Sequence, residues 1–282
     1  MRLVKIIALL LVAGSLLACT ISANVPKIQT GVTESLNIDE SAAANNTAAA
    51  VNIEMGAGSL NIAPGASATV QGTVEYNVHS WVPQVSNSGG QIKISQSNTS
   101  SVGVPDGQIV NTWELKLGQE PMELSIATGA NDGTFDLSGL ALTRLIVSDG
   151  ASRTKVVFDQ ANPGIMSLLQ YHTGASEVSL FGLANANAQE IEFSGGAGSY
   201  KLDFSGTLTQ DMEVRVSTGM SDLTLTIPEG VHAVVTINGG LSNINANGTW
   251  NISSNRYECG SSGPTINITV DMAVGNLNLN QN

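Results

Sequence analysis

The chain has 282 residues, which is enough for one or two domains with a sizeable hydrophobic core. Only 12% of the residues are charged, about half the usual share, and the formal net charge is −12. Without residues 1–18, which include Arg2 and Lys5, 9 basic residues stand against 23 acidic ones, a net charge of −14. Because nucleic-acid binding requires clustered Lys and Arg, we expect no nucleic-acid partner. The same charge disfavours flat electrostatic adhesion to anionic lipid.

Residues 1–18 have the three regions of a secretory signal peptide: a basic start, an apolar run over 6–13, and small residues before the cleavage point. Leu16-Leu17-Ala18-Cys19 resembles the lipobox of bacterial lipoproteins, which implies that Cys19 is diacylated and becomes the first mature residue. The alternative is an ordinary export signal with a chance cysteine. Several acyl chains, at about 0.8 kcal/mol per buried CH₂, would give stable anchoring. We therefore predict an extracytoplasmic protein that is lipid-anchored to the bacterial cell membrane.

A short lipidated tether over 19–30 is predicted next, because Pro26 interrupts any regular element. Residues 31–123 form a predicted N-terminal β region, with apolar and polar residues alternating over 32–38, 51–55, 59–62, 69–76, 91–97 and 111–117. Ile53 stands three positions before Gly56, which marks an early copy of the repeat that dominates the rest of the chain.

Residues 124–282 form a predicted β-repeat region with a C-terminal cap. Glycines recur there at slightly unequal intervals: Gly129, Gly150, Gly174, Gly196, Gly219 and Gly240. An apolar residue stands three positions before each: Ile126, Val147, Tyr171, Phe193, Val216 and Ile237. A second series recurs at a constant interval of 23: Phe135, Phe158, Phe181, Phe204 and Ile227. Such a period is typical of repeat architectures, in which each unit buries its apolar face against its neighbours.

Two all-β architectures fit this pattern, and we favour a parallel β-solenoid with about 21–24 residues per coil over an antiparallel meander. Equivalent positions of adjacent solenoid coils lie about 4.8 Å apart, so the phenylalanines would stack directly, whereas a meander would separate them by two strands. The turn glycines are expected to supply positive φ. A solenoid also needs atypical terminal coils to cover its ends, and Trp113 and Trp250 are the predicted covers.

The histidines and cysteines do not predict a metal or catalytic site. His79, His172 and His232 have no second His or Cys at metal-ligand spacing, so we interpret them as surface or turn residues. Cys259 would be the only free thiol once Cys19 is acylated, and no intramolecular disulfide is then possible.

One glycine-rich segment and three carboxylates could carry chemistry. Gly195-Gly-Ala-Gly198 is similar to a calcium-binding nonapeptide, but Tyr200 stands where the motif requires Asp. Asp136, Asp159 and Asp203 flank the phenylalanine series, so their side chains should point away from the core. They could form the catalytic site of a polysaccharide-active enzyme or merely a solvated strip. Because basic residues for substrate binding are scarce, we favour the strip and predict no catalytic residue, no cofactor, no metal and no enzyme activity.

Seven short segments share the pattern of one bacterial family: Gly56-Ala-Gly58, Asn111-Thr-Trp-Glu-Leu-Lys-Leu117, Asp136-Leu-Ser-Gly-Leu140, Leu180-Phe-Gly-Leu-Ala-Asn185, Gly195-Gly-Ala-Gly198, Leu202-Asp-Phe-Ser-Gly206 and Ile227-Pro-Glu-Gly-Val231. On these segments the chain resembles the toast-rack lipoproteins, which are related to the toastrack domains at the C-termini of bacterial envelope-stress regulators of the Lia and Psp type. The resemblance covers nearly the whole mature chain. It implies a toast-rack domain without established catalytic residues.

These observations predict a lipid-anchored, extracytoplasmic, non-catalytic scaffold or interaction module of the cell envelope. The resemblance implies a link to envelope-stress sensing, although the regulators usually carry transmembrane helices where this chain has a lipobox. The expected partners are the membrane, through the lipid on Cys19, and a basic envelope protein or peptide that complements the acidic surface. The alternative is a polysaccharide-active enzyme or a carbohydrate-binding β-helix.

Overall fold

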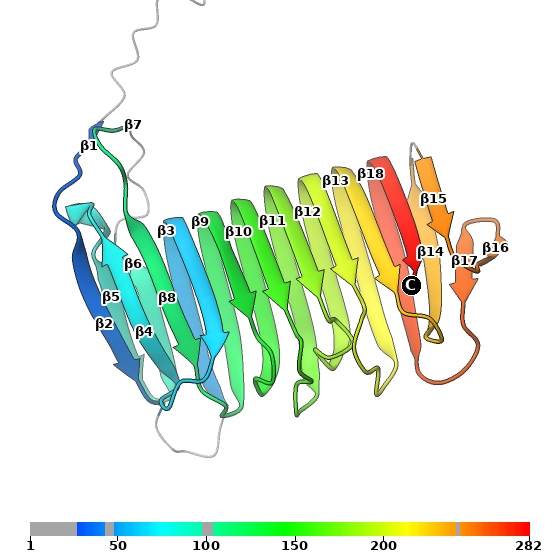
Figure 1. Ribbon diagram of the computed structural model, residues 1–282, viewed down its shortest axis with the longest axis horizontal. Coiled ribbons are helices and arrows are strands. Elements are labelled where there is room, and N and C mark those ends of the chain that lie inside the picture. The colour runs from blue at the N-terminus through cyan, green and yellow to red at the C-terminus, as the bar shows by residue number, and fades with distance from the viewer. Residues whose placement is uncertain (1–26, 43–47, 98–103, 241–242) are drawn as a thin grey trace, which may run out of the picture.

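The computed structural model describes residues 27–42, 48–97, 104–240 and 243–282, which are almost entirely β-strand (Figure 1). The predicted signal peptide, Cys19 and most of the tether lie outside the described residues. No helix in the described part of the chain has the length and apolar character needed to cross a bilayer.

Seven long strands lie parallel to one another and form the body of the molecule: β3 (Ala49–Pro64), β9 (Met122–Asp136), β10 (Leu142–Val157), β11 (Met166–Phe181), β12 (Ala188–Asp203), β13 (Met212–Ile227) and β18 (Thr265–Gln281). Each bends once near its middle, so that its two halves lie on opposite sides of the molecule (Figure 1). We call the layer of halves before the bend sheet I and the layer of halves after the bend sheet II. Inward-facing apolar side chains from both sheets form one continuous core.

The register of the strands confirms the all-β solenoid. Ile126 of β9 pairs with Val147 of β10, which pairs with Tyr171 of β11, and Phe193 of β12 and Val216 of β13 continue the row. All five side chains are buried. The first five residues that stand three positions before the glycines therefore stack from coil to coil, and the intervals between their glycines are the coil lengths. The sixth, Ile237, does not join Val216, because Val270 of β18 lies between them and pairs with both.

The turn glycines are required for a different reason from the one predicted. None of the glycines at the bends of β9 to β13 has a positive φ. A Cβ atom on Gly150 would lie 2.6 Å from the carbonyl oxygen of Gly129, and one on Gly174 would lie 2.4 Å from that of Gly150. The prediction of positive φ at these bends is wrong, because the constraint is the close approach of backbone from the preceding coil.

The predicted phenylalanine stack does not form. Phe135 pairs with Val156 rather than Phe158, and Phe181 pairs with Val157. Residues side by side differ in number by 21 between β9 and β10 but by 24 between β10 and β11, so a constant step of 23 drifts out of register. Phe158 is buried, whereas Phe181 is half-buried on the outer surface of sheet II.

The N-terminal end of the solenoid is closed by shorter strands on both sheets. In sheet I, β3 pairs with β6 (Gln91–Gln96), which pairs with β5 (Pro83–Ser88). In sheet II, β3 pairs with β8 (Asn111–Leu117), followed by the antiparallel strands β4 (Val70–Tyr76) and β2 (Glu34–Glu40). A 3₁₀ turn, η2 (His79–Trp81), and the short pair β1 (Lys27–Ile28) and β7 (Val104–Pro105) complete this end. Trp113 of β8 is fully buried in the core beneath these strands.

The C-terminal end departs from sequence order. The last strand, β18, lies between β13 and β14 (His232–Gly239), so β14 is displaced to the far side (Figure 1). Antiparallel β17 (Arg256–Cys259) and β16 (Asn251–Ser253) extend sheet I beyond β14, and β15 (Asn243–Asn247) pairs with β18 in sheet II. Trp250, between β15 and β16, packs half-buried against the core.

Candidate functional site

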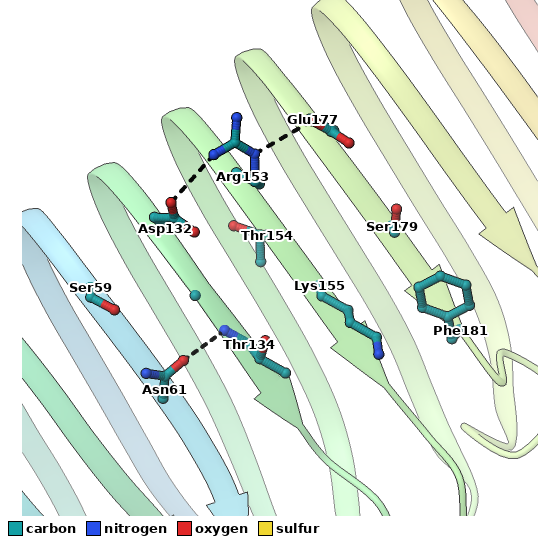
Figure 2. Close-up of a pocket in the computed structure, with 11 residues that line it drawn as sticks. Ser59, Asn61, Asp132, Thr134, Arg153, Thr154, Lys155, Glu177, Ser179 and Phe181 are labelled. Carbon is teal, nitrogen blue, oxygen red and sulfur yellow. Dashed lines mark hydrogen bonds and ion pairs between the residues drawn. The ribbon is translucent and has the colours of Figure 1, made fainter.

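A groove of about 690 Å³ crosses the outer surface of sheet II from β3 to β11, and we take it as the candidate site (Figure 2). Its lining residues come from neighbouring coils, whose equivalent positions lie side by side in the sheet. Arg153 of β10 pairs in register with Asp132 of β9 and with Glu177 of β11. Thr154 and Val156 face inward and are buried beneath the groove. The alternate residues Arg153 and Lys155 therefore face outward into it from a backbone that this packing holds in place.

An ion-pair chain crosses the upper part of the groove. The Arg153 guanidinium lies 3.5 Å from the Asp132 carboxylate and 3.5 Å from the Glu177 carboxylate, and Figure 2 shows it between them near the bends. All three side chains are more than half exposed, so each pair contributes little to stability. The three groups are therefore free to exchange their partners for a ligand at small cost.

An aromatic ring lies lower in the same groove. The Lys155 ammonium is 5.2 Å from the centre of the Phe181 ring, within the range of a cation–π contact. Lys155 pairs in register with Ser179, so Phe181 is its diagonal neighbour further along β11. The groove thus combines ionic, hydroxyl and aromatic surfaces.

The groove continues toward the N-terminal end as a second hollow of about 790 Å³ over β2, β4, β8, β3 and β9. Gly72 helps to form its floor, where a Cβ atom would lie 2.1 Å from the Glu114 carbonyl oxygen. Three carboxylates line this hollow, Asp39, Glu114 and Asp136, against the single ammonium of Lys116. The N-terminal part of the groove is therefore acidic.

The three carboxylates considered as a catalytic set are not all brought together. Asp136 and Asp203 occupy the same outward row of sheet II, but β10 and β11 lie between them, which separates them by about 14 Å at about 4.8 Å per strand. Each also accepts a hydrogen bond from its own turn, from the Ser138 and Ser205 backbone N–H groups respectively. Asp159 is exposed in the turn after β10. Paired glycosidase carboxylates lie closer, about 5–9.5 Å apart, so Asp136 and Asp203 are too far apart to form such a pair, and each stabilises its own turn.

A partly buried polar cluster lies at the bends of β10 and β11. The hydroxyls of Tyr171, Thr173 and Ser176 all donate hydrogen bonds to the Asp149 carboxylate. Burial, followed by the nearby Asp149 charge, raises the pKa of Tyr171 far above its usual value. Burial and Asp149 also raise the pKa of Tyr200, whose hydroxyl has no hydrogen-bond partner among the described residues. With its carboxylate held by three hydroxyls, the cluster is a structural network.

The Tyr200 side chain lies against the glycine-rich segment that is similar to a calcium-binding motif. A Cβ atom on Gly195 would lie 2.6 Å from the Tyr200 ring, and one on Gly198 would lie 1.9 Å from the Ser176 carbonyl oxygen and 3.1 Å from the Tyr200 hydroxyl. Gly195 therefore makes room for an aromatic ring, and Gly198 for the backbone of the preceding coil. Within the described residues, no group of three or more His, Cys, Asp or Glu side chains is arranged to hold a metal ion.

The structure reveals one cluster that the sequence did not predict. His232 of β14 contacts the Thr265 hydroxyl through Nδ1 at 2.9 Å and the Glu258 carboxylate through Nε2 at 3.1 Å. Glu258 also pairs with Arg256, and the His232 hydrogen bond, followed by Arg256, lowers the pKa of its carboxyl. The cluster links three neighbouring strands, β14, β17 and β18. Because Glu258 and Thr265 lie far from His232 in the sequence, no local motif signals it.

The remaining predicted residues lie apart from the groove. His79 is exposed in η2, with its Nδ1 atom 3.9 Å from the Glu34 carboxylate, and His172 is exposed on sheet I. Cys259 is buried at the end of β17, where burial raises the pKa of its thiol. Cys19, the predicted lipidation site, is outside the described residues.

Comparison with known proteins gives a family and several structures of similar topology. The family model for the N-terminal domain of toast_rack matches residues 26–166. A candidate cell adhesion protein from Clostridium sporogenes is 19% identical, with a TM-score of 0.46, over 89% of this chain and 99% of that one. A candidate adhesin from Bacteroides fragilis and a candidate lipid-binding protein from Parabacteroides distasonis are each 10% identical over the same shares of the chains, with TM-scores of 0.37 and 0.38. No curated protein matches the chain.

Proposed function

Because the chain belongs to the toast-rack family, we propose that it is a non-catalytic interaction module of the bacterial cell envelope, anchored outside the membrane by a lipid on Cys19. The observation that supports this most directly is the continuous groove along sheet II, which is built on hydrogen-bonded parallel strands and contains no convergent acid–base pair among its lining residues. A rigid surface of this kind binds at a low ordering cost.

The charges along the groove favour a basic partner. Its two hollows contain five carboxylates, Asp39, Glu114, Asp132, Asp136 and Glu177, and three cations, Lys116, Arg153 and Lys155. Electrostatic complementarity would steer a cationic peptide or the basic extracellular loops of a membrane protein to this face, and the association would weaken as salt rises. In an envelope-stress role, binding of such a partner in the groove would be the event that the protein senses.

The first experiment is affinity capture of the lipidated chain from intact membranes, followed by mass spectrometry and by binding of the captured basic partner across a salt series. Asp39→Asn with Glu114→Gln removes two charges and keeps a carbonyl acceptor for Gln71 and Asn61, which donate to them in the native chain. We expect this variant to bind several-fold more weakly at low salt, with a smaller salt dependence.

The matched control removes the same charge elsewhere. Glu123→Gln with Glu229→Gln changes two exposed carboxylates that do not line either hollow. Equal weakening in both variants would mean that net charge, and not the groove, drives binding. A partner that binds the groove variant as tightly as the native chain, or reproducible turnover of a polysaccharide that disappears in Asp203→Asn, would contradict the proposal.

A further inference from the structure

A regular array of asparagine side chains covers the C-terminal end of sheet II. We call it the asparagine grid, and it consists of Asn243, Asn245 and Asn247 of β15 and Asn276, Asn278 and Asn280 of β18. The two strands are parallel and pair the residues in order, Asn243 with Asn276 through to Asn247 with Asn280. The residues between them on β18, Leu277 and Leu279, are fully buried, so the asparagines face outward.

The grid is ordered by its own hydrogen bonds. Asn245 Nδ2 donates to Asn278 Oδ1 at 3.0 Å, and Asn247 Nδ2 donates to Asn280 Oδ1 at 2.9 Å. A carboxamide has two N–H donors and an oxygen with two lone pairs, so each member of these pairs keeps hydrogen-bonding capacity toward solvent. The carboxamides therefore present donors and acceptors at about 4.8 Å across the strands and about 6.6 Å along them.

Strand stability does not explain the choice of residue. Asparagine is among the residues least favoured in β-strands, whereas Thr or Val would stabilise an outward-facing strand position. The equivalent positions in β10 are Arg153 and Lys155, and in β12 they are Ser199 and Lys201. Six carboxamides in two neighbouring strands thus replace a mixture of charged and hydroxyl groups, so this end of sheet II presents a different surface chemistry from the preceding coils.

The grid is also neutral, in a chain with 23 acidic and 11 basic residues. The nearest charge in register is Asp222 of β13, which accepts a hydrogen bond from Asn276 at 2.6 Å. Beyond Asn278 and Asn280 the register continues with Thr224 and Thr226. Sugar hydroxyls both donate and accept, as carboxamides do, so they match this surface without requiring a charge. We propose that the asparagine grid binds a neutral, hydroxyl-rich polysaccharide chain lying flat on sheet II.

The test is affinity electrophoresis of the full lipidated chain in detergent, through native gels that contain a linear β-glucan, dextran, an acidic polyuronate or no polysaccharide. Asn245→Ala with Asn278→Ala removes one amide pair from the middle of the grid. Asn238→Ala with Asn251→Ala is the matched control, because both residues are exposed on sheet I. We expect at least one neutral polysaccharide to retard the native chain, and the retardation should not depend on salt. The grid variant should bind that polysaccharide about tenfold more weakly, and the control should bind it as the native chain does.

Hydrogen exchange of the native chain tests the same point without a substitution, should the grid variant fold poorly. The bound polysaccharide should slow exchange within 243–247 and 276–280 and leave β5 and β6 unchanged. The proposal is wrong if no neutral polysaccharide retards the chain, or if the grid variant is retarded as strongly as the native chain. This outcome is separable from that of the groove, because binding of a basic partner there depends on salt and on Asp39 and Glu114.

Discussion

Gly174→Ala tests whether close backbone approach, rather than backbone conformation, fixes the glycines at the bends. The added Cβ would lie 2.4 Å from the Gly150 carbonyl oxygen, about 1 Å inside an ordinary carbon–oxygen contact. Neighbouring coils can separate only by stretching the hydrogen bonds on both sides of the bend. Overpacking of this kind costs about 1–3 kcal/mol. The lower unfolded-state entropy of alanine offsets about 0.4–1 kcal/mol of this.

The structure itself limits the size of the effect. In β18 the position next to Gly219 is Ala273, so one coil accommodates a methyl group in this row. We therefore expect a net loss of about 1–2 kcal/mol for Gly174→Ala. Gly164→Ala, in the turn before the same strand, is the control: a Cβ there meets nothing within 4 Å and φ is not positive. That variant should be neutral or more stable by up to about 1 kcal/mol.

Urea unfolding followed by tryptophan fluorescence measures both variants. A lower midpoint for Gly174→Ala at an unchanged slope would show a change in stability rather than in the extent of unfolding. If Gly174→Ala and Gly164→Ala unfold at the same urea concentration, the glycines at the bends are not required by contact between coils and the reasoning is refuted.

Four further results are expected. Phe158→Ala should lower the free energy of unfolding by about 3–5 kcal/mol in urea titrations, because the side chain is 1% exposed. Tyr200→Phe should cost nothing measurable or stabilise the fold. Tyr171→Phe should lower the free energy of unfolding by about 1–3 kcal/mol, because it leaves the half-buried Asp149 carboxylate with one donor fewer, and calorimetry of the two variants measures the difference. The raised pKa of Tyr171 keeps its hydroxyl protonated in the folded state. Its contribution to the free energy of unfolding is therefore complete below pH about 10 and is lost as pH rises above this, where the tyrosine of the unfolded chain ionises. Above pH about 10 the urea midpoint of the native chain should fall more steeply than that of Tyr171→Phe. Cys19→Ala should abolish incorporation of labelled palmitate and release the chain from membranes, and native protein without acyl mass would contradict the lipoprotein prediction.

The sequence determines the coil but not all of its contacts. The apolar residues three positions before Gly129, Gly150, Gly174, Gly196 and Gly219 stack from coil to coil, because they and these glycines follow the true coil length. The phenylalanine series does not, because its constant interval conceals coils of unequal length. The insertion of β18 beside β13 could not be predicted from the period either, since β14 to β17 lie between Val216 and its partner Val270 in the sequence.

The ion-pair chain of the groove could have been predicted from the sequence, whereas the His232 cluster and the asparagine grid could not. Asp132, Arg153 and Glu177 follow one another at steps of 21 and 24, which are the glycine intervals, so the coil length alone places them side by side. His232 meets Glu258 because β17 pairs back on β14, and it meets Thr265 because β18 is inserted on the other side of β14. No periodic signal encodes that arrangement. The asparagine grid depends on the same insertion.

The two proposed surfaces belong to one sheet but differ in chemistry, and the architecture keeps them independent. The charged groove ends at β11, the grid begins at β18, and β12 and β13 lie between them. In a solenoid each coil contacts only its neighbours, so a substitution in one surface should not alter the other. A chain that carries both the groove and the grid substitutions should therefore lose affinity for each ligand by the same factor as the corresponding single variant, and only its affinity for the basic partner should depend on salt. A protein with both surfaces could hold a basic partner and a neutral polysaccharide at a separation fixed by the number of coils between them.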